Sequence, residues 1–274
     1  MPRVSVIMAT YNCEKTLKRS INSILSQTFS DWEFIICDDC STDNSYQVLL
    51  DYLRDYPQKF TVLKNRKNSK LSYSLNRCLE VAKGEYIARM DGDDESFPDR
   101  LKKQVEFLDE HPEYSVVGTA MVPFDEKGDK PIRYPIEVPG PKDLLSRSPI
   151  FHATIMMRKE AYLAVGGYTV SKRTERAQDY DMWFRFFAKE LKAYNLQYGL
   201  YHVLEDDTAI KRRTFKTRYY EVQTKLLGYK KLEYPWYLYF FAFKPLFAAM
   251  VPSRAMLKYH MVTDKKSNKT AKKE

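Results

Sequence analysis

Four acidic side chains lie within five positions of the sequence, at the end of a short apolar run. The stretch GEYIARMDGDDESFPDRL begins at Gly84, and its acidic residues are Asp91, Asp93, Asp94 and Glu95. The mutual repulsion of these carboxylates must be offset, and a divalent cation can do so because hard cations take oxygen ligands. A solvated turn is the alternative, since Asp and Gly are common turn residues. The spacing alone leaves both interpretations open.

A second acidic pair lies between two cysteines, in Cys37-Asp38-Asp39-Cys40. This C-x-x-C spacing raises the possibility of a zinc or redox site. A structural zinc site needs a second pair of ligands nearby in the sequence, and none is present. We therefore expect the four cysteines to be reduced thiols of a cytosolic protein.

The elements that must position these residues alternate over the first 124 residues. Strand-like apolar runs cover Val4 to Ala9, Phe34 to Ile36, Phe60 to Leu63 and Tyr86 to Met90. Apolar residues at helical spacing follow each run: Leu17, Ile21, Ile24 and Leu25; Tyr46, Leu49, Leu50 and Leu53; Leu71, Leu75, Cys78, Leu79 and Ala82; Leu101, Val105 and Leu108. Ser41 or Thr42 is the expected N-cap of the second helix, and Pro98 and Asp99 are expected to begin the fourth.

Strands that alternate with helices predict parallel βαβ units and a doubly wound sheet. Ligands of such sheets bind outside the carboxyl ends of the strands. This rule places three segments on one rim: Thr10 to Asn12, Asp38-Asp39, and Asp91 to Asp94. The metal interpretation of the acidic cluster is then favoured. No glycine-rich phosphate loop occurs in the sequence, so a metal held by Asp93 is the expected means of binding a diphosphate.

The charge of the chain is uneven. Residues 1–199 carry 29 Lys and Arg against 29 Asp and Glu, whereas residues 200–274 carry 16 against 7 and hold the whole net charge of +9. The last quarter therefore suggests a polyanionic partner, either nucleic acid or an anionic membrane. The N-terminus has no charged segment followed by an apolar one, so we expect no secretory signal.

In the motifs that contain these residues, the sequence resembles the family 2 glycosyltransferases of bacterial polysaccharide biosynthesis. The resemblance runs from about Val4 to Ala209 through VSVIMATYN, CDDCSTDNS, GEYIARMDGDD, PDRL, HATIMMRK, GGY and QDYDMW. It implies an α/β fold of the GT-A type, a doubly wound, mostly parallel sheet flanked by helices, with a helical, aromatic and basic C-terminal extension. It also implies transfer of a sugar from a nucleotide donor to a hydroxyl, with inversion at the anomeric carbon.

The resemblance assigns donor-binding roles to residues of the predicted rim. Thr10 and Tyr11 correspond to nucleotide-binding positions, with Tyr11 stacking on the base. Asp39 corresponds to the aspartate that accepts a hydrogen bond from the base; Asp38 could instead belong to a turn. Asp91 and Asp93 match the D-x-D motif: Asp91 reaches the ribose or the diphosphate, and Asp93 coordinates Mn²⁺ or Mg²⁺.

The catalytic base implied by the resemblance is Asp179 in Gln178-Asp179-Tyr180-Asp181. A positioned carboxylate can contribute ~10²–10⁴-fold by removing the acceptor proton. Asp181 is a rival, but it is expected to serve the start of a helix instead. His152, Gly167 and Tyr168 match positions on the acceptor side; since a lone histidine is more often structural, His152 depends on the resemblance.

The sequence departs from the family pattern in four places. Gln178 replaces the glutamate that commonly precedes the base, and Lys70 stands where many relatives have glycine. His202 takes a shifted place in the segment where relatives carry R-x-H, and we do not expect it to be a metal ligand. The Q-x-x-R-W signature of processive synthases is absent, which favours one sugar per encounter.

The expected function is that of a non-processive hexosyl- or N-acetylhexosaminyltransferase using a UDP-sugar and a glycan acceptor, expected to be lipid-linked. Two alternatives are a metal-dependent nucleotidyl or phosphoryl transferase and a nucleic-acid-binding protein. The neutral first 199 residues argue against the second, so no nucleic acid is expected as a partner. The expected domains are a catalytic unit at 1–210, with a nucleotide-sugar half at 1–100 and an acceptor half at 101–210, and a basic helical region at 211–274.

The aromatic stretch YPWYLYFFAFKPLFAAMV, from Tyr234 to Val251, is too short and too interrupted to span a bilayer. Aromatic residues beside basic ones suit the membrane interface, where the tail lysines would face anionic lipid. Those lysines are Lys258, Lys265, Lys266, Lys269, Lys272 and Lys273. This predicts a cytoplasmic protein bound peripherally to the inner face of the cell membrane. The alternative is a helix packed on the catalytic domain, followed by a lysine tail.

Overall fold

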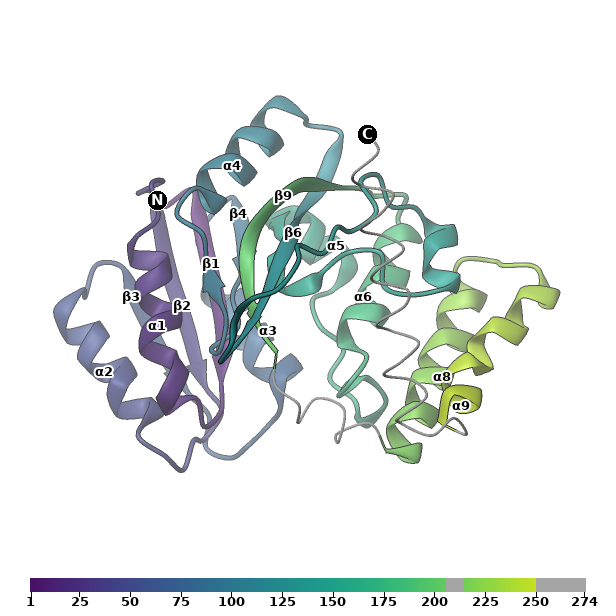
Figure 1. Ribbon diagram of the computed structural model, residues 1–274, viewed down its shortest axis with the longest axis horizontal. Coiled ribbons are helices and arrows are strands. Elements are labelled where there is room, and N and C mark those ends of the chain that lie inside the picture. Colours follow the sequence, from purple (N-terminus) through teal and green to yellow (C-terminus); the bar gives the residue numbers. More distant parts are fainter. Residues whose placement is uncertain (206–213, 250–274) are drawn as a thin grey trace.

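The computed structural model describes residues 1–205 and 214–249, and its first half alternates strands and helices as predicted (Figure 1). These elements are β1 (Val4–Thr10), α1 (Glu14–Leu25), β2 (Trp32–Asp38), α2 (Ser45–Asp55), β3 (Phe60–Lys64), α3 (Leu71–Val81) and β4 (Tyr86–Arg89). Each predicted strand and helix is present. The GT-A-like α/β fold is thereby confirmed for the part of the chain that the sequence pattern addressed.

The second half adds shorter and longer elements. They are β5 (Glu95–Ser96), α4 (Arg100–Glu110), β6 (Tyr114–Asp125), β7 (Gly128–Asp129), η1 (Pro141–Leu145), η2 (His152–Thr154), β8 (Met156–Arg158), α5 (Lys159–Val165), η3 (Lys172–Thr174), α6 (Gln178–Phe187) and β9 (Lys192–Leu204). Pro98 and Asp99 immediately precede α4, as predicted, and Asp99 is its N-cap.

The strands of the described residues form one sheet in the order β3-β2-β1-β4-β8-β6-β9-β5, with β7 paired to β6. The pairs among β3, β2, β1 and β4 are parallel, and so is the long β6–β9 pair. The short strands β8, β5 and β7 pair antiparallel with their neighbours. The parallel half therefore has the rim at which sheets of this kind bind ligands, and β8 joins this half to the second one.

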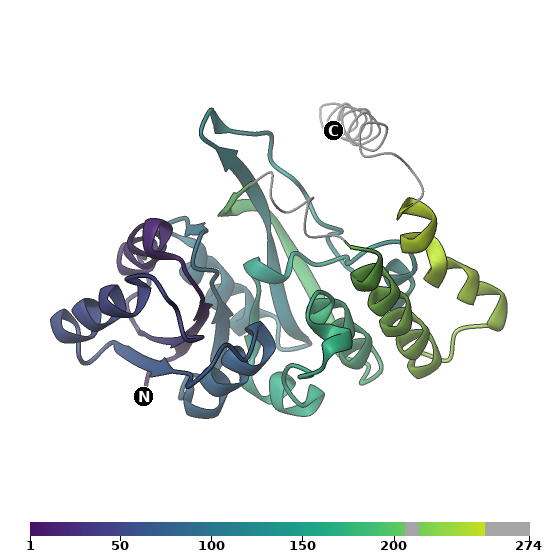
Figure 2. The same cartoon turned by 90° about the horizontal axis from the view of Figure 1, so that it is seen from below.

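Two apolar clusters cover the two faces of the sheet, because alternate residues of each buried strand point to opposite sides. Val6 and Met8 of β1 face the cluster formed with α1, α2 and α4. Ile7 faces the other cluster, which includes α3, α5 and α6. Figure 2 shows helices on both sides of the strands.

The N-cap predicted for α2 is wrong. The helix begins at Ser45 after Asn44, and neither Ser41 nor Thr42 caps it. Both residues instead bind Asn12 in the loop after β1: Ser41 Oγ accepts a hydrogen bond from Asn12 N at 3.0 Å, and Thr42 N donates to Asn12 Oδ1 at 2.8 Å. The groups of Ser41 and Thr42 that could have capped the helix are instead used in hydrogen bonds between two loops of the rim.

The C-terminal elements pack on the same apolar cluster as α3, α5 and α6. They are α8 (Phe215–Lys231), η4 (Trp236–Phe243) and α9 (Lys244–Ala249). A Cβ atom on Gly228 of α8 would lie 2.2 Å from ring atoms of Phe184 in α6, so the two helices are in close contact at this glycine. The next residue, Tyr229, is fully buried. Among the described residues, no helix is both long and apolar enough to cross a membrane.

Candidate functional site

The three predicted segments meet at one edge of the sheet. Thr10 and Asp38 are register partners at the ends of β1 and β2, and Asp39 N donates a hydrogen bond to Thr10 O at 2.8 Å. A Cβ on Gly92 would lie 3.4 Å from Cγ2 of Thr10, so the acidic segment after β4 touches the end of β1. The prediction that parallel strands bring these segments together is confirmed.

Tyr11 and Asp39 occupy different environments on this rim. The Tyr11 side chain is 46% exposed, so its ring is accessible to a ligand. The Asp39 carboxylate is buried and accepts hydrogen bonds from Asn65 Nδ2 at 2.6 Å, Ser69 N at 2.7 Å and Lys70 N at 2.8 Å. Asp39 therefore fixes the loop before α3, in which Lys70 adopts a positive φ of 73°.

The acidic segment is electrostatically crowded. Burial raises the pKa of Asp94 well above its ordinary value, and the carboxylates of Asp91 and Asp93 raise it further. Asp94 Oδ1 accepts a hydrogen bond from Leu204 N at 2.9 Å, which ties this segment to β9. Asp91 is paired with Arg89, whereas Asp93 is exposed at the rim.

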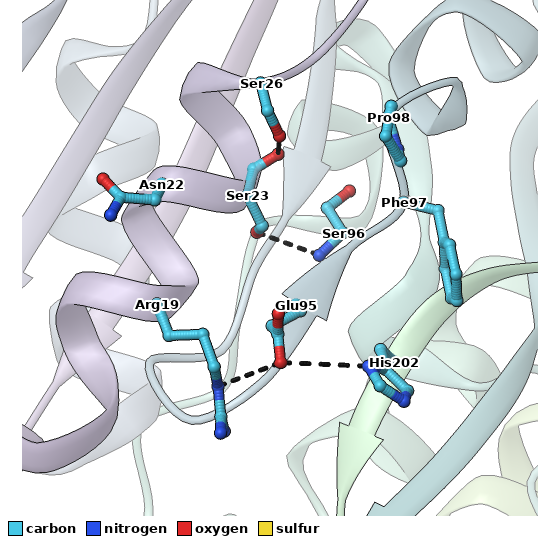
Figure 3. A pocket seen from close by; sticks show the side chains of 9 residues that line it. All are labelled: Arg19, Asn22, Ser23, Ser26, Glu95, Ser96, Phe97, Pro98 and His202. Atoms are coloured by element: carbon cyan, nitrogen blue, oxygen red, sulfur yellow. Dashed lines mark hydrogen bonds and ion pairs between the residues drawn. The ribbon is translucent and has the colours of Figure 1, made fainter. Parts of the chain in front are cut away.

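Glu95, the fourth acidic residue, belongs to a different surface hollow of about 680 Å³ beside α1 (Figure 3). Its carboxylate lies between Arg19, at 2.9 Å, and His202, at 3.8 Å. His202 also contacts Asp129 through Nε2 at 2.7 Å. The imidazole of His202 is thus engaged by Glu95 and Asp129.

Arg89 is a residue of the site that the sequence reasoning missed. It ends β4, its side chain is 5% exposed, and its Nη2 donates to Asp91 Oδ1 at 2.7 Å. Its positive charge also opposes the burial that raises the pKa of Asp179, and it lowers the pKa of His152 in addition to the larger effect of burial. A charged residue inside the apolar run Tyr86 to Met90 was the available signal.

The residues predicted for the acceptor side belong to a buried aromatic cluster. His152 Nε2 lies 2.9 Å from the Tyr168 hydroxyl, and the Tyr162 hydroxyl lies 3.2 Å from the same atom. The His152 ring packs edge-on against Trp183 of α6 at 5.2 Å. Gly167 has a positive φ of 64°, and Tyr168 after it is held by Asn76, whose side chain bonds both its N–H and its carbonyl.

The two aspartates at the start of α6 differ. Burial raises the pKa of Asp179, the second residue of the helix. Asp181 is held by Thr169 at 2.6 Å, Arg173 at 2.8 Å and Arg185 at 2.9 Å. Both oxygens of Asp181 are therefore engaged by these partners, from the loop before η3, from η3 and from α6 itself.

Tyr168 connects the two halves of the site. Burial has the largest effect in raising its pKa, Arg89 opposes it, and the carboxylates of Asp91 and Asp179 add to it. The Tyr168 hydroxyl bonds His152 of η2, and the carbonyl of Ile155, just after η2, accepts a hydrogen bond from Arg89 N at 3.0 Å. Tyr168 is thus linked through η2 to the end of β4, where Arg89 pairs with Asp91.

Several residues of this region carry a buried polar atom without a hydrogen-bond partner. Within the described residues these atoms include Thr10 Oγ1, Asp38 Oδ1, Arg89 Nε, His152 Nδ1 and Gln178 Oε1. Such atoms are rare in folded proteins and are commonly satisfied by a ligand, an ion or water. Three of them belong to residues at the ends of β1, β2 and β4, which is the edge where ligands of parallel sheets bind.

The comparisons with known proteins agree with this geometry. The glycosyl transferase family 2 model matches residues 5–174, and the chain belongs to that family. It is 46% identical over 262 residues to the putative glycosyltransferase EpsE of Bacillus subtilis, covering 94% of this chain and 93% of that protein. The chain is therefore a glycosyltransferase.

A more distant relative and a solved structure extend the comparison. The chain is 27% identical over 195 residues to WfaP of Escherichia coli, a UDP-Glc:alpha-D-GlcNAc-diphosphoundecaprenol beta-1,3-glucosyltransferase, covering 71% of this chain and 74% of that protein. The crystal structure of Staphylococcus aureus TarS 1-349 with UDP-GlcNAc is similar with a TM-score of 0.66 and 21% identity. That match covers 82% of this chain and 66% of the TarS chain, and it shows the shared fold.

Proposed function

We propose that this glycosyltransferase moves a hexosyl or N-acetylhexosaminyl group from a UDP-sugar to a hydroxyl of a lipid-diphosphate-linked glycan, one sugar per encounter and with inversion. The observation that carries the proposal is the meeting of the segments after β1, β2 and β4 at one rim, to which Tyr168 is linked through His152 and η2. A donor bound at the rim and an acceptor hydroxyl at the start of α6 would meet beside Tyr168. WfaP, a relative, has a UDP-sugar donor and a diphosphate-linked acceptor in its name.

In this mechanism Asp179 accepts the proton of the acceptor hydroxyl as its oxygen attacks the anomeric carbon. The bond between that carbon and the UDP phosphate oxygen breaks on the opposite face, which inverts the configuration, and UDP carries away the electron pair. The raised pKa of Asp179 suits a general base because a more basic carboxylate takes the proton more readily. On the donor side, Tyr11 stacks on the uracil ring of UDP, and Thr10 and Asp39 border that ring. Asp91 orients the ribose or the diphosphate.

The residues present also fit a divalent cation. Burial has the largest effect in raising the pKa of Asp94, and the carboxylates of Asp91 and Asp93 add to it; a cation would offset the charge of these two carboxylates. In the described part of the chain, no three His, Cys, Asp or Glu side chains converge as a ready metal site. Asp93 would therefore hold Mn²⁺ or Mg²⁺ together with donor phosphate oxygens, where the cation supplies charge neutralisation of the diphosphate.

His152, Gly167 and Tyr168 would form the wall on which the acceptor sugar rests. Their hydrogen bonds and the packing of Trp183 keep this wall rigid. The nucleotidyl-transferase and nucleic-acid-binding alternatives are not retained, because membership in a glycosyltransferase family accounts for both the donor rim and Asp179.

The C-terminal region would bring the enzyme to an anionic membrane surface on the cytoplasmic side. Trp236, Tyr237, Phe240 and Phe241 are exposed, while Tyr229 and Ala242 are buried against the catalytic part. The described segment thus combines packing on the domain with an aromatic surface suited to the membrane interface. The basic residues proposed to face lipid, Lys258 to Lys273, lie outside the described residues.

The test is UDP binding followed by a donor screen. We expect UDP to raise the melting temperature of the intact chain in the presence of Mn²⁺ or Mg²⁺, and the rise to disappear with EDTA. One UDP-sugar of a panel should be hydrolysed slowly without acceptor. Absence of stabilisation by UDP with either metal would contradict the proposed donor.

A further inference from the structure

A basic hollow of about 240 Å³ lies between η3 and the first turns of α8. Its lining includes four cationic side chains, Lys172, Arg173, Arg176 and Lys216, against one carboxylate, Glu175. The hollow is smaller than the 300–1,000 Å³ usual for drug-sized ligands, so it suits a compact anion. It shares no lining residue with the hollow beside Glu95.

Of the four cationic side chains of this hollow, one bonds other parts of the fold and three form no ion pair among the described residues. Arg173 donates to Asp181 at 2.8 Å and to Thr224 at 3.0 Å, and so holds η3 against α6 and α8. Lys172, Arg176 and Lys216 have no carboxylate within ion-pair distance among the described residues. The N-terminal N–H groups of α8 add positive potential on the same side. The hollow therefore retains an excess of positive charge in a fixed frame.

The hollow adjoins both the segment that leads to the proposed base and a second hollow that reaches the nucleotide-binding loop. The chain runs from Lys172 through η3 directly into α6, which carries Asp179 near its start. A neighbouring hollow of about 210 Å³ shares Lys172 and Glu175 and is lined on its other side by Ser69 and Lys70, the residues whose N–H groups bind Asp39. The two hollows thus extend from the nucleotide-binding loop to α8.

On its other side the basic hollow adjoins α8, the helix that leads to the segment carrying the aromatic surface. The helix α8 packs against both η4 and α9, and Arg218 Nη1 donates to Pro245 O at 2.8 Å. If an acceptor bound its sugar at Asp179 and its lipid at the aromatic surface, the group that joins the sugar to the lipid would lie near α8. In a lipid-linked glycan that group is an anionic diphosphate.

From these relationships we propose that Lys172, Arg176 and Lys216 bind the diphosphate that joins the acceptor glycan to its lipid. Arg176 can bind phosphate oxygens in a bidentate manner, and the two lysines supply point charges. Arg173 acts by positioning η3 and does not itself need to touch the ligand. This subsite rests on the proposed lipid-diphosphate acceptor, and it assigns recognition of that group to this chain's own residues.

The test uses geranyl diphosphate as the probe, added to the full chain after UDP and Mn²⁺ have saturated the donor rim. We expect calorimetry to show saturable binding, weakened at least about tenfold in Lys172→Gln/Lys216→Gln. The matched control is Lys189→Gln/Lys192→Gln, which removes the same charge from exposed lysines beyond the other end of α6. All four lysines are exposed, so both variants should fold, and equal melting temperatures verify it.

A second arm separates the acceptor diphosphate from a lipid headgroup. Flotation with phosphatidylglycerol vesicles is measured for the same variants. Loss of geranyl diphosphate binding in the first variant alone supports the subsite. The subsite is overturned if geranyl diphosphate does not bind the wild-type chain, or if it binds both variants equally. It is also overturned if Lys172→Gln/Lys216→Gln loses only vesicle flotation. Because UDP stabilisation is measured in the same samples, failure of the donor proposal is seen separately.

Discussion

Arg89 Nη2 lies 2.7 Å from Asp91 Oδ1 in a setting where only 5% of the arginine side chain is exposed. The same guanidinium acts on Asp179 and His152, so one buried charge influences the donor rim, the proposed base and the proposed acceptor wall. Arg89 does not need to touch either substrate to affect transfer. We propose that it positions Asp91 and sets the charge balance of the site.

The first prediction follows from that charge. Burial raises the pKa of Asp179 and Arg89 opposes the rise, so the acid limb of kcat/KM should lie above the ordinary carboxyl range in the wild type. Arg89→Gln removes the opposing charge and should move this limb to still higher pH, with about a 10²-fold loss of activity from misplaced Asp91. Arg89→Lys should move the limb less. A pH–rate profile with no shift between Arg89→Gln and wild type would contradict the assignment.

The second prediction separates chemistry from donor binding. Asp179→Asn removes the base without altering the rim, so kcat should fall by about 10²–10⁴-fold while UDP affinity stays within about twofold. Asp93→Ala should weaken metal-dependent UDP binding and activity together. Calorimetry with UDP and turnover of the donor found by screening measure both. Substantial transfer by Asp179→Asn would remove the proposed base.

A third prediction concerns Asp39, whose carboxylate accepts hydrogen bonds from two backbone N–H groups of the loop before α3. In Asp39→Asn an amide can turn only one oxygen toward these donors, and one N–H is left buried without a partner. We expect a loss of about 1.5–3 kcal/mol of stability without any ligand present, in addition to weaker UDP binding. The matched control is Asp38→Asn, because one oxygen of Asp38 already has no partner among the described residues. Unchanged stability of Asp39→Asn would show that the loop does not depend on this carboxylate.

These residues also show how far the sequence could reach. The rule for parallel strands was sufficient to place Thr10, Asp38 and Asp91 on one rim, because strand direction fixes which ends meet. The role of Arg89 was not visible, since its partners come from an adjacent loop, from η2 and from α6. The strands β5 and β8, of two and three residues, carry no periodic signal and exist only because long neighbours pair with them. The N-cap at Ser41 or Thr42 failed for a similar reason, as contacts with Asn12 outweighed a local preference.

The fourth prediction uses Asp181 as a stability probe. Burial alone would raise its pKa, but Thr169, Arg173 and Arg185 outweigh burial, and the pKa is lowered overall. A depressed carboxyl pKa stabilises the fold above the pKa of the unfolded state, and this stabilisation is lost as the pH falls through the folded value. Asp181→Asn leaves two partly buried arginines without their partner and should cost about 3 kcal/mol at pH 7. The difference from wild type should shrink in acid.

Urea unfolding at pH 7 and at pH 3 measures that difference. Asp51→Asn is the control, because Asp51 makes an exposed i,i+3 ion pair with Arg54 that should contribute little. A penalty for Asp181→Asn that is equal at both pH values would mean that the ion pairs do not carry the stabilisation.

The last prediction concerns the aromatic surface of η4. Truncating the chain within α8 would remove Tyr229, which is fully buried against Phe184 and the rest of the core, so lost membrane binding could not be told from lost folding. Trp236 and Phe240 are instead 84% and 69% exposed, and replacing them leaves the buried side chains in place. We expect Trp236→Ser/Phe240→Ser to reduce flotation with phosphatidylglycerol vesicles at least about tenfold, because aromatic side chains favour the bilayer interface. UDP stabilisation should be unchanged.

The control is Leu163→Ser/Val138→Ser, which removes exposed apolar side chains elsewhere on the surface. High salt should weaken wild-type flotation further if basic residues also face the lipid. Equal flotation of the two variants, or a wild-type chain that stays in the aqueous fraction at low salt, would rule out η4 as the contact with the membrane.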